Sequence, residues 1–170
     1  MNNQAFIDGQ NLTLGTTLSD DPWKIDLYRF RTYLRQKYNI DKAYYFVGCI
    51  DDNLQDLYDM LQDAGFIIVF RAHGGELTSN KKGNVDTDIV FSMMRNFHEN
   101  PYNGKTYLIS GDGDYYKTIK YLKEQEKLGK VLFPAHRNAS SLYRQIGNAY
   151  YDYLDNPGVR RKIELKNWHK

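Results

Sequence analysis

Short apolar runs alternate with amphipathic stretches from one end of the 170-residue chain to the other. This alternation is typical of a parallel sheet with helices on both faces, because parallel strands need long crossover connections, usually helical, that return the chain to the same edge. We expect five strands, each short and apolar as in a sheet covered on both sides. They are residues 5–7, 43–48, 66–70, 106–110 and 130–134. The pattern therefore predicts an α/β protein.

The stretches between these runs have the spacing of amphipathic helices. In DNLQDLYDMLQDAG, the apolar residues from Leu54 to Leu61 fall at positions i, i+3, i+4 and i+7. In VDTDIVFSMMRNF, the residues Ile89, Met93 and Phe97 share one helical stripe. Crossovers in such a sheet are right-handed, and its ligands bind outside the carboxyl ends of the strands. These strand ends are therefore the expected location of a functional site.

Length and composition favour one domain over residues 1–156, followed by a basic tail over residues 157–170. With 41% hydrophobic residues, the chain can bury a single core. The net charge is only +2, but the tail has five Lys and Arg residues against one Glu, so it could hold a polyanion or simply be solvated. No segment approaches the roughly 18 apolar residues of a membrane span, and no leader precedes AFID. We expect a cytoplasmic protein.

The sequence does not favour sulfur or histidine ligands for a metal. Cys49 is alone, so it can form neither an internal disulfide nor a thiolate cluster. The four histidines include no i, i+4 pair of the kind that binds zinc on a helix. Any metal is therefore expected to have oxygen ligands.

Acidic residues gather where strands are expected to end. Asp8 follows the first apolar run, Asp112 and Asp114 follow the fourth, and Asp86 and Asp88 open the helix after KKGN. Each of them alone is typical of a helix start or an Asp-Gly turn. Together at one sheet edge they would repel one another unless a cation intervened. The oxygen-only set predicts Mg²⁺ or Mn²⁺, acting on a phosphate.

Three other acid-rich sites fit the sequence less well. An EF-hand calcium loop needs acids at alternate positions, and Tyr116 breaks that series after Asp112 and Asp114. VDTDIV is similar to the Asp-x-Asp motif of haloacid-dehalogenase phosphatases, but it follows KKGN instead of an apolar strand. A receiver domain of a two-component system needs a phosphoacceptor at the third strand, and RAHGG has none.

Four segments carry a resemblance to a known family. They are IDGQN at the first strand, KGNVD before the third helix, SGDGDYYKTIKYL after the fourth strand and NASSLYRQ after the fifth. Together they resemble the NYN domain, the LabA-like branch of the PIN-like ribonucleases, over roughly residues 4–154. Two positions depart from the family pattern: Asn84 is an extra residue before Val85-Asp86, and Ser92 stands where relatives often have an acid.

The resemblance implies a three-layer PIN-like (Rossmann-like) fold and a five-stranded, mainly parallel sheet of order 3-2-1-4-5. The catalytic, metal-binding acids of the family fall on Asp8, Asp86, Asp112 and Asp114. The supporting positions fall on Asn11, Ser110, Ser140 and Ser141, with Asp88 as an alternative to Asp86 for the third ligand.

The activity implied by the resemblance is that of a metal-dependent endoribonuclease with one or two Mg²⁺ or Mn²⁺ ions. Single-stranded or loop RNA is the expected substrate. The loop RAHGGELTSNKKGN is longer than usual connections, and Arg71, Lys81 and Lys82 are its expected phosphate contacts. The competing hypothesis is a PIN-like module that binds RNA or a protein partner without cleavage. The sequence is compatible with a monomer or a homo-oligomer.

Overall fold

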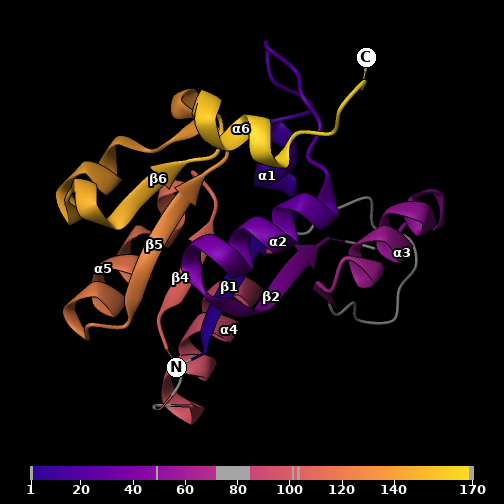
Figure 1. Cartoon of the computed structure of the whole chain (residues 1–170). Helices are drawn as coiled ribbons and strands as arrows, with labels where there is room; N and C mark the ends of the chain where they lie inside the picture. Colours follow the sequence, from indigo (N-terminus) through magenta and orange to yellow (C-terminus); the bar gives the residue numbers. More distant parts are fainter. Residues whose placement is uncertain (1, 49, 72–84, 101, 103, 169–170) are drawn as a thin grey trace.

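A six-stranded sheet forms the centre of the protein. The computed structural model describes residues 2–48, 50–71, 85–100, 102 and 104–168. Every neighbouring pair of strands is parallel, in the order β3-β2-β1-β4-β5-β6 (Figure 1). The strands are β1 (Asn3–Asp8), β2 (Ile40–Val47), β3 (Ile67–Phe70), β4 (Thr106–Ile109), β5 (Leu128–Phe133) and β6 (Tyr151–Tyr153). The predicted fold class and the order of the first five strands are confirmed.

The sheet has one strand more than the sequence predicts. β6 lies parallel to β5, with Val131 opposite Tyr151 and Phe133 opposite Tyr153. The strand has only three residues, all of them half-buried, so it lacks the apolar run that marks the other strands. It also follows three 3-10 turns instead of an amphipathic helix. These turns are η3 (His136–Asn138), η4 (Ser141–Ile146) and η5 (Asn148–Tyr150).

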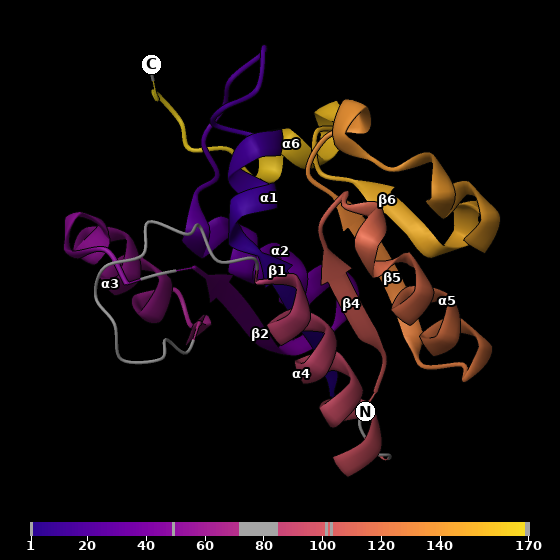
Figure 2. The ribbon, with the colours of Figure 1, turned by 180° about the vertical axis from the view of Figure 1, so that it is seen from behind.

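Helices cover both faces of the sheet, as predicted (Figures 1 and 2). One face carries α1 (Gly9–Gly15), α2 (Leu27–Tyr38), α3 (Gln55–Asp63) and α6 (Pro157–Ile163); the other carries α4 (Asp86–Glu99) and α5 (Tyr116–Glu124). Side chains of β1 alternate between the two cores: Ala5 and Ile7 pack under α2, and Phe6 packs under α4. Among the described residues, no helix is long and apolar enough to cross a membrane.

The segment after residue 156 packs against the body of the protein. Ile163 of α6 is fully buried in the same core as Phe30 of α2. The backbone N–H of Asp26 donates to the carbonyl of Ile163 at 2.8 Å, and Arg160 pairs with Asp21 and Glu164. The first half of the predicted basic tail is therefore a helix that contributes to the core.

Candidate metal centre

Asp8 is the buried acid of the site and lies at the carboxyl end of β1. It follows Ile7 in a strand of alternating faces, so its side chain lies on the face that α4 covers. Its Oδ1 accepts from the backbone N–H of Asn11 at 2.9 Å, and its Oδ2 accepts from Ser110 Oγ at 3.4 Å. Burial raises the pKa of the Asp8 carboxyl above its ordinary value, and the nearby charge of Asp86 adds to the increase. The hydrogen bonds it accepts oppose this shift.

Tyr115 joins Asp8 to a second acid. The side chain is completely buried, and its hydroxyl lies 2.6 Å from Asp86 Oδ1 and 3.1 Å from Asp8 Oδ2. Burial, followed by the negative charge of Asp8, raises the pKa of the phenol far above its ordinary value. The hydroxyl is therefore a permanent donor that connects the end of β1 with the first turn of α4.

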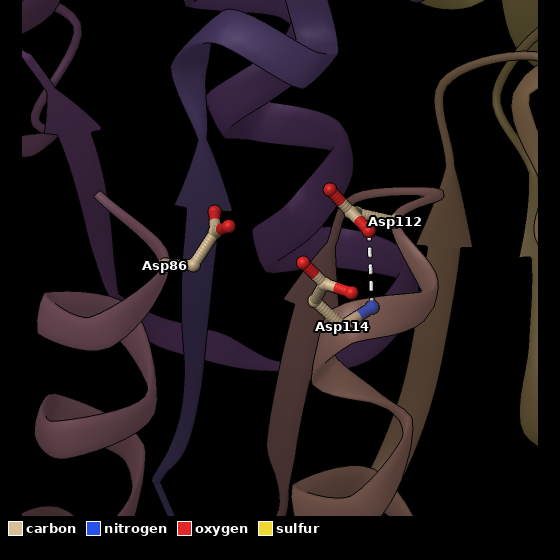
Figure 3. Close-up of side chains that lie close together, drawn as sticks. All are labelled: Asp86, Asp112 and Asp114. Carbon is tan, nitrogen blue, oxygen red and sulfur yellow. Dashed lines mark hydrogen bonds between the residues drawn. The ribbon is translucent and has the colours of Figure 1, made fainter. Parts of the chain in front are cut away.

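Three further acidic side chains lie close to one another at the same end of the sheet. One carboxylate oxygen from each of Asp86, Asp112 and Asp114 lies within 4.8 Å of the other two. Figure 3 shows Asp86 reaching from the start of α4 toward Asp112 and Asp114, which extend from the turn after β4. Asp86 and Asp112 are half-buried and Asp114 is exposed. We call these three residues the acidic trio.

The turn after β4 positions two members of the acidic trio. Asp112 begins the 3-10 turn η2 (Gly113–Tyr115), where its Oδ1 accepts from the backbone N–H of Asp114 at 3.0 Å (Figure 3). The carbonyl of Asp112 accepts from the hydroxyl of Tyr143 in η4 at 2.6 Å. The backbone N–H of Asp112 lies 3.2 Å from Ser110 Oγ. Both side chains are therefore held by a short turn whose backbone is fixed from two sides.

Gly111 allows another segment to pass very close to this turn. A Cβ atom at position 111 would lie 2.2 Å from the carbonyl oxygen of Asn138. Across this contact, the backbone N–H of Ser140 donates to the carbonyl of Gly111 at 2.9 Å. Ser140 Oγ also caps η4 by accepting from Leu142, whereas Ser141 is exposed. A glycine is thus required here by close approach and not by backbone angles.

Of the other predicted residues, Asp88 lies on a different side of α4 from Asp86. It lies two residues beyond Asp86, a rotation of roughly 200° about the helix axis, and lines a different groove together with Phe91 and Ser92. Arg71 follows β3 and is half-buried. Lys81, Lys82 and the extra Asn84 lie outside the described residues.

The acidic trio has the donor set of a hard cation. Oxygens that share one octahedral Mg²⁺ at roughly 2.0–2.1 Å lie about 3–4 Å apart. The three carboxylate oxygens lie within 4.8 Å of one another, so they need at most a small closure to share one ion. Carboxylates this close repel one another, and a divalent cation would remove that cost. The residues present therefore fit Mg²⁺ or Mn²⁺.

Two tyrosines of the site were not identified from the sequence. Both Tyr115 and Tyr143 are buried. They lie in two of the segments that resemble the NYN domain, SGDGDYYKTIKYL and NASSLYRQ, but neither tyrosine was among the expected site residues. A buried tyrosine normally needs a partner for its hydroxyl, and here that partner belongs to the site.

The chain is similar to known proteins in both sequence and structure. The family model described as "NYN domain" matches residues 4–153. No curated protein matches the chain. Among solved structures, a protein of unknown function from Vibrio parahaemolyticus is similar, with a TM-score of 0.72, 18% sequence identity and 96% of each chain covered. At this identity, the structural match supports the fold alone.

Proposed function

Because the chain belongs to the NYN domain family of PIN-like nucleases, we propose that it is a metal-dependent ribonuclease that hydrolyses internal phosphodiester bonds of RNA. The observation that carries this proposal is the acidic trio, whose carboxylate oxygens lie within 4.8 Å of one another at the carboxyl ends of the strands. Open parallel sheets bind their ligands at this edge.

In this proposal, the carboxylates of Asp86, Asp112 and Asp114 would hold Mg²⁺ or Mn²⁺. Asp8 would be the fourth, buried acid of the site. When bound, such a cation supplies an acidified water and offsets the negative charge of the phosphoryl oxygens. Asp114 is the exposed member of the acidic trio, so it can accept a proton from a water that approaches from solvent. The water oxygen would bond to phosphorus in line with the leaving oxygen as the P–O3′ bond breaks, and the 3′ oxygen would take a proton from solvent, which gives a 5′-phosphate and a 3′-hydroxyl.

We propose single-stranded or loop RNA as the substrate class. The buried or half-buried carboxylates can reach a phosphate only if the strand comes close to the sheet edge, which an unpaired strand can do more easily than a duplex. Arg71, Lys81 and Lys82 are the proposed contacts with flanking phosphates, because cationic side chains neutralise the RNA backbone. Ser110 and Asn11 serve the reaction by fixing the turn that carries Asp112.

The test is cleavage of labelled single-stranded and hairpin RNAs, with single-stranded DNA alongside, in Mg²⁺, Mn²⁺ or EDTA. We expect products that need the metal and are lost in Asp112→Asn and Asp86→Asn. Asp88→Asn tests the alternative ligand on the same helix, and we expect it to retain activity. Asp59→Asn on α3 is a control for removing an exposed acid far from the site.

A second candidate function is an RNA-binding module without turnover. Ser92 favours it, because the family resemblance implies an acid at this position, and the serine removes one potential carboxylate from α4. RNA binding by the native chain without metal-dependent products would support this module and contradict the ribonuclease proposal.

A further inference from the structure

We propose that Tyr115 is a positioning residue of the metal centre, whose hydroxyl holds the Asp86 carboxylate in the orientation that faces Asp112 and Asp114. The inference rests on the proposed cation site of the preceding section. It adds a residue that carries no negative charge and has no free surface.

The three acids differ in how they are anchored. Asp112 and Asp114 belong to one turn and are joined by a 3.0 Å hydrogen bond between the Asp112 carboxylate and the Asp114 backbone. Asp86 comes from a separate helix, α4. A contact between the turn and α4 therefore sets the position of the Asp86 carboxylate relative to the other two acids.

Tyr115 makes this contact from a fixed position. It directly follows Asp114 in the chain, and its hydroxyl lies 2.6 Å from Asp86 Oδ1. The ring is completely buried in a core cluster that includes Phe6, Ile89 and Leu108. A donor on a completely buried ring thus links the Asp86 side chain to the turn that carries the other two acids.

The Tyr115 hydroxyl lies within hydrogen-bond distance of two acceptors, Asp86 and Asp8. A phenol has one proton to donate, and the distance to Asp86 is 0.5 Å shorter than the 3.1 Å to Asp8 Oδ2. Asp8 in addition accepts from the backbone N–H of Asn11 and from Ser110. The geometry therefore assigns the phenol proton to Asp86.

The variant Tyr115→Phe removes the hydroxyl and keeps the ring. Mn²⁺ binding, measured by the loss of the free-ion electron paramagnetic resonance signal, should weaken by about tenfold or more, as is usual when the partner of a metal ligand is lost. The control is Tyr58→Phe in α3, which removes a hydroxyl that accepts from the backbone N–H of Asp51. This variant should leave the Mn²⁺ affinity unchanged.

A double-mutant cycle separates positioning from a general structural role. If Tyr115 acts through Asp86, then Tyr115→Phe should have little further effect on Mn²⁺ affinity once Asp86→Asn is present. Additive losses in the cycle would contradict the proposal, as would native affinity in Tyr115→Phe.

If Tyr115→Phe does not fold, 4-aminophenylalanine and 4-fluorophenylalanine are introduced at position 115, since both fill the space of the hydroxyl but only the amine can donate. Affinity restored by the amine alone supports the proposal, and equal affinities overturn it. Absence of Mn²⁺ binding by the native chain would instead refute the cation site itself.

Discussion

The side-chain oxygen of Asn11 accepts a hydrogen bond from the backbone N–H of Gly111 at 2.8 Å. These residues leave the adjacent strands β1 and β4 at the same edge of the sheet. The backbone N–H of Asn11 also donates to Asp8 Oδ1. One asparagine therefore fixes the relative positions of the buried acid and of the turn that carries Asp112 and Asp114.

The variant Asn11→Ala should destabilise the protein. It leaves the buried N–H of Gly111 without its acceptor, which costs about 1–3 kcal/mol. The free energy of unfolding from urea titration measures this loss. The control Gln62→Ala, at an exposed position of α3, should change it by less than about 0.5 kcal/mol. Equal midpoints for Asn11→Ala and the native chain would contradict the role of Asn11.

The variant Gly111→Ala should be destabilised by overpacking. Its Cβ would lie 2.2 Å from the carbonyl oxygen of Asn138, so one of the two backbones must move, at a cost of about 1–3 kcal/mol. The matched control is Gly158→Ala in α6, where no atom lies within 4 Å of the new Cβ. That variant should be neutral or gain roughly 0.5–1 kcal/mol from helix propensity. Similar thermal midpoints for both variants would refute the close-approach argument.

Asp8 should make the metal-free protein less stable as the pH rises. Burial holds its folded pKa above the ordinary value of 3.8, so the native state binds the proton more tightly than the unfolded state. Its contribution is therefore favourable at pH below 3.8 and is lost as the pH increases through the folded pKa. The variant Asp8→Asn stays neutral, and its stability relative to the native chain should improve over this interval.

Thermal unfolding in EDTA at a series of pH values between about 4 and 8 measures this trend around the reference pKa of Asp. The exposed Asp59→Asn variant is the control for replacing an acid at the surface of the protein. A constant difference between Asp8→Asn and the native chain at every pH would show that burial of Asp8 does not penalise its charged form.

The variant Ile163→Ala should show that α6 belongs to the folding unit. Ile163 is fully buried against α2, and truncating such a side chain costs about 2–5 kcal/mol. Lys162→Ala removes an exposed neighbour on the same helix and should change stability by less than about 0.5 kcal/mol. Chemical denaturation distinguishes the two, and a neutral Ile163→Ala would mean that α6 is dispensable for the core.

The sequence predicts the elements that are long and regularly patterned. The five apolar runs fall in or overlap β1 to β5, because the central strands of a sheet covered on both faces bury an apolar run. β6 and the 3-10 turns before it have no such pattern: β6 pairs with β5 through half-buried tyrosines and an aspartate. Their position follows from tertiary contacts, such as the approach of Asn138 to Gly111.

Within the candidate site, the sequence locates the acids but not their connections. Helical periodicity separates Asp86 from Asp88, since the two point to different sides of α4. It cannot show which side faces the turn after β4, because that depends on how α4 packs on the sheet. The role of Tyr115 cannot be predicted for the same reason. Its ring fits the apolar spacing of a core residue, and its hydrogen bond to Asp86 depends on how α4 packs against the turn after β4.

The central place of β1 has a consequence for synthesis of the chain on the ribosome. β1 emerges before both of its partners, β2 and β4, and β4 ends at Ile109. Until that residue has left the exit tunnel, one edge of β1 has no partner, and Phe6 and Ile7 lack part of their cover. The centre of the sheet can therefore close only after β4 has been synthesised, and during that interval the nascent chain exposes an apolar strand edge to chaperones.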